Sequence, residues 1–136
     1  MIDRTVDKAI ASFLGTIPGL SVVVGAEDNY PVLETPYLVI YSNINGFTGR
    51  IPIYELLTTI EYQSISGQDL VANVENIMSQ VDALIGPGGD HSATPGVNTS
   101  GLSYLAWESI SRGVQDVGDR RKNIRELLVR AQPVST

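Results

Sequence analysis

The sequence predicts an α+β fold, in which a mostly antiparallel four-stranded sheet carries two helices packed on one face. Two segments have the apolar spacing of helices, and four segments have the composition and alternation of strands. Each helical segment stands before a pair of strands, which gives the order α-β-β-α-β-β. The 136 residues, 1–136, are predicted to form a single domain, because this length is typical of one domain.

The clearest helical pattern spans residues 66–86. Its apolar residues recur every three or four positions and therefore share one helix face; they are Leu70, Val74, Ile77, Met78, Val81, Leu84 and Ile85. Ser66 is a candidate N-cap, and Asp69 places a carboxylate in the first turn, where the helix dipole favours it. Gly86 and Pro87 end the pattern, because glycine allows a left-handed cap and proline cannot continue a helix.

A first helix is predicted at the N-terminus. Apolar residues with helical spacing form the face that we expect to pack on the sheet: Ile2, Val6, Ile10, Phe13 and Ile17. Asp3 and Asp7 lie in the early turns, where carboxylates suit the helix dipole. Gly15 and Pro18 end this segment.

Four strands are predicted, at residues 37–43, 54–66, 102–111 and 123–131. The first is apolar nearly throughout, which is typical of a central strand. The second has one face that we expect to be the wetter, with Leu57, Thr59, Glu61 and Gln63. The fourth contains residues that favour helices, but its alternation and the following proline favour a strand. Ser21–Val24 is a candidate for a further short strand.

Three connections separate these elements. Residues 43–53 contain the turn dipeptide Asn45-Gly46 and link the first two strands. The apolar residues of this link either fold back onto the domain or form a hairpin arm that docks on a neighbour. Residues 86–101 are rich in Gly, Ser and Pro and are predicted to form a flexible loop. Residues 112–122 are predicted to form a polar turn.

The charge of the chain is acidic and uneven. The net charge of −6 argues against generic nucleic-acid binding. Residues 1–111 hold 12 acids and 3 bases, whereas residues 112–136 hold 3 acids and 6 bases. An acidic body and a basic end suit a contact between copies of the chain or with a partner of complementary charge. Ordinary scatter of surface charge accounts for the same distribution equally well.

The sequence carries no pattern typical of a catalytic, cofactor or metal site, and we do not expect an enzyme. It has no cysteine, which excludes disulfides and thiolate metal sites. The one histidine, His91, lies between Asp90 and Ser92, and side chains in direct succession cannot converge as a catalytic triad. The Gly-rich run at residues 86–90 follows a helix, whereas a phosphate-binding loop precedes one.

The sequence also predicts no contact with a membrane. No apolar run approaches the ~18 residues that a membrane span requires. The N-terminus mixes acids and bases in an amphipathic pattern, so it resembles neither a secretory signal nor a transit peptide. We therefore expect synthesis inside the cell.

Taken together, these segments resemble the tail terminator (tail completion) proteins of long-tailed bacteriophages. The resemblance lies in the chain length, in the element order and in stretches that cover nearly the whole chain. Those stretches are Pro36–Ser42, Thr58–Ser66, the helix at residues 66–86, Tyr104–Ile110 and Arg120–Ala131.

The resemblance implies a ring, typically a hexamer, on the end of a finished tail tube. Such a ring stops further addition of the major tail tube protein and presents a surface to the head connector or head-closure protein. DNA passes through it only as cargo, and an acidic lumen suits this because carboxylates repel phosphates. The resemblance places the chain in the virion, at the head-proximal end of the tail, after synthesis in the cytoplasm of the bacterial host.

The candidate interface residues come from the arm and from the basic end of the chain. They are Phe47, Arg50, Ile51, Arg112, Asp116, Asp119, Arg120, Arg121 and Lys122. The arm at residues 43–53 and the loop at residues 86–101 are candidates for contacts with the tube or the head. The basic residues are expected to meet the acidic surface of a neighbouring copy. Pairing with nearby acids of the same chain, or with phosphates, stays open.

Two other functions also stay open. One is another structural component of the same particle, such as a head-tail connector or a neck or baseplate adaptor. The other is a small enzyme or ligand-binding α+β domain. That last function would require a pocket lined by converging polar groups.

Overall fold

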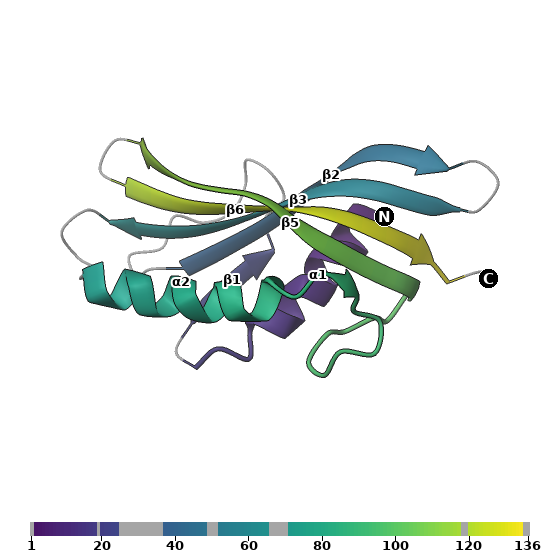
Figure 1. Ribbon diagram of the computed structural model, residues 1–136, viewed down its shortest axis with the longest axis horizontal. Helices are drawn as coiled ribbons and strands as arrows, with labels where there is room; N and C mark the ends of the chain where they lie inside the picture. Colours follow the sequence, from purple (N-terminus) through teal and green to yellow (C-terminus); the bar gives the residue numbers. More distant parts are fainter. Residues whose placement is uncertain are drawn as a thin grey trace.

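The structure is a computed structural model, and it describes residues 2–18, 20–24, 37–48, 52–65, 71–117 and 120–134. These residues form two helices and six strands, shown in Figure 1. In chain order the elements are α1 (Ile2–Leu14), β1 (Ser21–Val24), β2 (Tyr37–Thr48), β3 (Ile53–Ile65), α2 (Val71–Ile85), β4 (Gly89–Asp90), β5 (Leu102–Val117) and β6 (Arg120–Pro133).

The six strands form one mixed sheet in the order β1-β2-β3-β6-β5-β4. β1 and β2 run parallel, and every other neighbouring pair is antiparallel. The predicted α+β fold with a four-stranded, mostly antiparallel sheet is therefore wrong, because the structure is a mixed α/β fold with six strands. The two additional strands, β1 and β4, have only four and two residues. The candidate strand Ser21–Val24 is confirmed as β1, but segments this short carry too little alternation to predict the direction of a strand or a two-residue strand such as β4.

The two long hairpins, β2–β3 and β5–β6, extend further than predicted. Residues 43–48, predicted as part of a linking arm, continue β2 and pair with the start of β3. Residues 112–117 and 120–122, predicted as a polar turn, complete β5 and begin β6. The described side chains at the end of β5 are exposed, so polar residues suit this strand. Composition alone does not separate an exposed strand from a turn.

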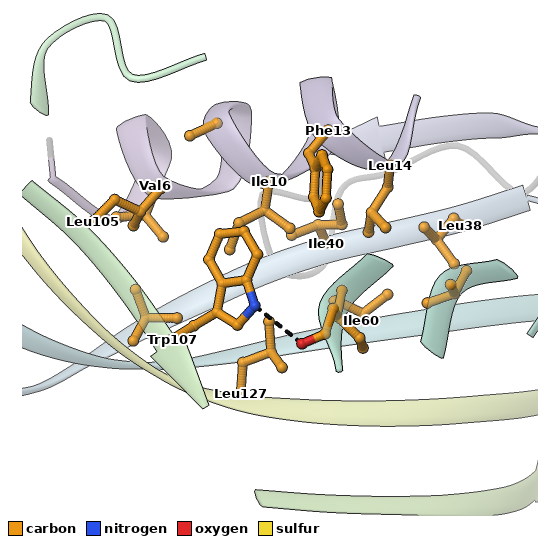
Figure 2. Close-up of a cluster of buried hydrophobic side chains, with 14 of the residues drawn as sticks. Val6, Ile10, Phe13, Leu14, Leu38, Ile40, Ile60, Leu105, Trp107 and Leu127 are labelled. Carbon is orange, nitrogen blue, oxygen red and sulfur yellow. Dashed lines mark hydrogen bonds between the residues drawn. The ribbon is translucent and has the colours of Figure 1, made fainter. Parts of the chain in front are cut away.

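Both helices lie on the same face of the sheet and enclose the apolar core (Figure 1). Figure 2 shows side chains from α1 and from four strands that meet in this core: Val6, Ile10, Phe13, Leu14, Leu38, Ile40, Ile60, Leu105, Trp107 and Leu127. The Trp107 indole is 1% exposed, and its Nε1 donates a hydrogen bond of 3.1 Å to the backbone oxygen of Ile85. This bond fixes the last turn of α2 to β5.

The face of β3 that points away from the helices was expected to be the wetter one, and that expectation is wrong. Glu61 and Gln63 on this face are 5% and 2% exposed. Gln63 Nε2 donates to Glu61 Oε2 at 3.1 Å, and the Tyr41 hydroxyl donates to Glu61 Oε1 at 2.7 Å. The Tyr37 hydroxyl donates to Gln63 Oε1 at 2.9 Å. The burial of these polar side chains is compatible with folding because they satisfy one another's hydrogen bonds.

A buried carboxyl group joins α1 to the sheet. Asp7 is 3% exposed, and one of its oxygens accepts a 2.5 Å hydrogen bond from the Ser42 hydroxyl of β2. The Ser42 hydroxyl also lies 2.7 Å from the Thr58 hydroxyl of β3. Burial, helped by the nearby Asp3 carboxylate, raises the pKa of Asp7 to about 7 despite this hydrogen bond. One oxygen of Asp3 is itself buried without a hydrogen-bond partner.

The buried Asp7 predicts a pH-dependent stability. Its pKa in the folded chain, about 7, exceeds the unfolded value of 3.8, so the folded state binds more protons between these two values. The free energy of unfolding therefore falls as the pH rises through this window. We expect a loss of roughly 2–3 kcal/mol between about pH 5 and about pH 8, since one pKa unit corresponds to ~1.4 kcal/mol.

The substitution Asp7→Asn tests this prediction, because it keeps an oxygen that accepts the Ser42 hydrogen bond and removes the titration. Urea unfolding at both pH values is followed through the fluorescence of Trp107, the only tryptophan of the chain. The variant should lose most of the decrease that the parent shows on going to the higher pH. An equal decrease in both proteins would show that Asp7 does not carry the effect.

Candidate self-association surfaces

The tip of the β2–β3 hairpin presents apolar side chains to solvent. Ile44 and Phe47 are 48% and 54% exposed. The Phe47 ring packs against Tyr54 of β3, with 4.7 Å between ring centroids. Asn45 Nδ2 donates to Glu55 Oε1 at 3.3 Å beside them. This hairpin reaches one end of the long axis of the molecule (Figure 1). We call these five residues the tip.

The β5–β6 hairpin reaches the opposite end of the long axis (Figure 1). It also carries exposed apolar residues, since Ile110 is 51% and Val114 is 63% exposed. β4 pairs with β5 only at Ala106 and Trp107. Within the described part of the chain no strand covers the outer edge of β5 at residues 109–115, and all of these residues are exposed.

A groove separates β5 from α2. Ile85 lines it from the helix, Ile110 and Arg112 line it from β5, and an ion pair forms its floor. In that pair Arg125 Nε of β6 lies 2.7 Å from Asp82 Oδ1 of α2, and Arg125 Nη2 donates to Asp82 Oδ2 at 3.3 Å. Arg125 is only 9% exposed, so this two-pronged contact ties α2 to the sheet in a partly dry environment.

A second groove lies on the other side of the same ion pair, where Val74 and Met78 of α2 face Asn123 of β6. Asn123 is 8% exposed, and its Nδ2 has no hydrogen-bond partner. A buried donor without an acceptor costs roughly 1–3 kcal/mol.

The predicted basic cluster divides between an exposed and a buried environment. Arg112 and Arg121 are exposed on the β5–β6 hairpin. Lys122 instead points to the buried polar face of the sheet, and its Nζ lies 3.7 Å from Glu61 Oε2. Within the described residues no carboxylate forms an ion pair with Arg112.

The structure places the other predicted interface residues only in part. Asp116 lies opposite Arg121 in the β5–β6 ladder, and Arg120 lies opposite Val117, but the side chains of Asp116 and Arg120 are outside the described set. Asp119 lies outside the described residues, and so do Arg50 and Ile51 of the predicted arm. The register thus places Arg121 and Lys122 near the β5–β6 end of the sheet and Phe47 near the tip of the β2–β3 hairpin.

Sequence reasoning did not include Ile110, Val114 and Asn123 among the interface candidates. Ile110 belongs to a strand that was predicted correctly. The sequence pattern does not reveal that its side chain is 51% exposed beside α2. Val114 fell in the predicted polar turn, where an isolated apolar residue carries little weight. The unpartnered Nδ2 of Asn123 is visible only in three dimensions.

The segment predicted as a flexible loop, residues 86–101, packs on β5 through its histidine. His91 is 6% exposed, and its ring stacks on Trp107 with 3.6 Å between centroids and 4° between planes. His91 Nε2 donates to the Pro87 oxygen at 2.6 Å, so Nδ1 accepts from the Thr94 hydroxyl at 3.0 Å. This environment gives His91 a role in packing.

Three further observations on the described residues concern metal ions, the raised pKa of Asp7 and membranes. They contain no group of three or more His, Asp or Glu side chains that would hold a metal ion. Asp7, whose pKa is strongly raised, does not line either groove beside α2. No helix among them has the length and apolar character that crossing a membrane requires.

No protein-family model matches this chain, and no curated protein matches it either. The function is therefore inferred from the exposed surfaces of the structure and from the pattern of the sequence.

Replacing the buried histidine should weaken the packing of residues 86–101. His91→Ala removes a stacked ring and two hydrogen bonds, so we expect a loss of about 2–4 kcal/mol in the free energy of unfolding. Because Trp107 loses its cover, its fluorescence emission should shift to longer wavelength. His91→Phe is the matched control, since it keeps a ring on the indole and should keep the emission near that of the parent. Unchanged emission in His91→Ala would contradict this role.

Charge reversal should destabilise the chain more at a basic residue in the buried network than at an exposed one. Lys122→Glu places a second carboxylate beside the buried Glu61, and we expect it to cost about 2–4 kcal/mol. Arg130→Glu is the control on the same strand, because Arg130 meets Glu55 at 3.9 Å in an exposed pair and should cost less than ~1 kcal/mol. Urea unfolding of both variants measures the difference. Equal losses would mean that Lys122 is not part of the buried network.

Proposed function

We propose that this chain is a structural protein of a long-tailed bacteriophage that forms a ring on the end of the tail tube. The ring stops polymerisation of the tube and provides the surface to which the head joins. Its partners are other copies of the chain, in a proposed hexamer, the major tail tube protein and the head connector or head-closure protein. DNA passes through the ring as cargo, and the protein acts in the virion without catalysing a reaction.

The observation that carries this proposal is the pair of exposed apolar surfaces at opposite ends of the sheet. The register places Phe47 opposite Tyr54 near one end of β3, and it places Val114, through Asn123, level with Tyr62 near the other end. Ile44 and Ile110 are exposed nearer the middle of the sheet. Exposed apolar surfaces are typical of contacts with other proteins. A protein with different surfaces at its two ends joins head to tail, and such contacts close into rings when the rotation between copies allows it.

The charge of the chain and the resemblance of its segments support the same proposal. A net charge of −6 suits a lumen that repels DNA phosphates. The segments that resemble tail terminator proteins include the strand Tyr104–Ile110, which leads into the exposed part of β5, and the stretch Arg120–Ala131, which lies within β6. A connector elsewhere in the neck or baseplate of the particle would use the same kinds of surface, so the site of binding on the particle separates the two functions.

Tail-tube assembly tests the proposed function. Purified protein is added to polymerising major tail tube protein, and the tubes are examined by electron microscopy with the added chain carrying a gold label. We expect label at one end of each tube and a halt in further growth at that end. Label along the whole tube or at no end would contradict the terminator function. Binding to the isolated head connector without binding to tubes would favour a neck adaptor.

A further inference from the structure

We infer that the two ends of the sheet are the two halves of one contact between copies of this chain. In this contact, residues 43–48 of β2 in one copy lie along the open edge of β5 in the next, at residues 109–115. The inference rests on the proposed function for the claim that copies form a ring, and it identifies the surfaces that meet.

Both strands have an open edge on the correct sides of the sheet. β1 pairs with β2 only at residues 37–40, and β4 pairs with β5 only at residues 106–107. In the described part of the chain, no strand pairs with the outer edges of residues 43–48 or 109–115. These two edges face opposite ways across the sheet, because β2 lies near the β1 side and β5 near the β4 side. Pairing between them therefore continues the sheet from copy to copy.

The exposed apolar residues of the two edges lie on the same face of the sheet. Ile44 stands opposite Leu56 and Phe47 opposite Tyr54, and both β3 residues belong to the core face. Val114 stands opposite the buried Asn123, and Ile110 lines the groove beside α2. A continued sheet would thus bring the apolar pair of one copy beside the apolar pair of the next, on the side that the helices cover.

The polar groups of the two surfaces are complementary. The groove side offers donors and positive charge through the exposed Arg112. The tip offers acceptors through the side-chain oxygen of Asn45 and the half-exposed carboxylate of Glu55. Opposite charges at the rim of an interface orient the partners and favour the correct one.

The contact is heterologous, which means that its two surfaces differ. Each surface can therefore be disrupted by its own substitution. Phe47→Glu breaks the tip and leaves the groove intact, whereas Val114→Glu breaks the groove side and leaves the tip intact. Both residues are exposed, so neither change should unfold the chain. Ala83→Glu, on the exposed face of α2 and outside both surfaces, is the matched control.

Light scattering over a range of concentrations measures the association. We expect the parent and Ala83→Glu to form oligomers, and each of the other variants to associate at least about tenfold more weakly. A mixture of Phe47→Glu and Val114→Glu should form a complex of two chains and nothing larger, because only one intact tip and one intact groove can meet. Variants that assemble like the parent, or a mixture that forms no complex while the parent assembles, would overturn the inference.

A covalent trap gives an independent test and uses the absence of cysteine from the chain. Asn45→Cys and Gln115→Cys place one thiol on each surface, and diamide oxidises thiols that meet. The double variant should give a ladder of linked multimers on a non-reducing gel, while each single variant should give at most a dimer. A double variant that stops at dimers would overturn the head-to-tail contact. The contact would also be overturned if the parent stays monomeric and the double variant does not cross-link.

The inferred contact and the proposed terminator function can fail independently of each other. A contact that forms in solution, together with tubes that are not capped, would contradict the terminator function and leave the contact standing. Capped tubes formed equally well by Phe47→Glu and Val114→Glu would contradict the contact and leave the terminator function standing.

Discussion

The difference in length between helices and strands is the constraint on which the rest of this structure depends. α2 has 15 residues and spans roughly 22 Å, because a helix rises ~1.5 Å per residue. β5 has 16 residues and spans roughly 53 Å at ~3.3 Å per residue. α2 begins near the β5–β6 end of the sheet and runs toward its middle, and neither helix reaches the tip of the β2–β3 hairpin (Figure 1). The apolar side chains at that tip therefore have no helix over them within the described chain, and those of β5 lie at the edge of the sheet.

Three polar contacts fix the helices on the sheet. The Asp7–Ser42 hydrogen bond holds α1 on β2, and the bond from Trp107 to the Ile85 oxygen holds the end of α2 on β5. The Arg125–Asp82 pair holds α2 on β6. Each contact is directional, whereas apolar burial alone would let a helix slide along the sheet. The grooves beside α2 have their shape because these contacts set its position.

Periodicity predicted the helices and the centres of the long strands, because burial on one face imposes a repeat on the sequence. It indicated Ser21–Val24 as a candidate strand but not its parallel pairing with β2. It did not predict the two-residue β4 or the outer thirds of the hairpins, where few side chains are buried. It also misjudged Glu61 and Gln63, whose burial depends on partners from other strands. For the candidate surfaces, Phe47 and Arg112 were recognisable as unusual residues of a link and a turn. Val114 and Asn123 were not, because the exposure of the first and the unpaired donor of the second are visible only in three dimensions.

Two open edges with exposed apolar residues are also a risk, because such edges pair with any available strand. Both edges here contain a β-bulge, between Ile44 and Gly46 in β2 and between Ser109 and Ser111 in β5. A bulge bends its strand and interrupts the ladder, so it limits the partners and the registers that an edge accepts. The bulges lie beside the exposed Ile44 and at Ile110 itself. The backbone is thus irregular beside the exposed apolar side chains. This irregularity favours one partner whose shape fits the edge over the unlimited addition of strands.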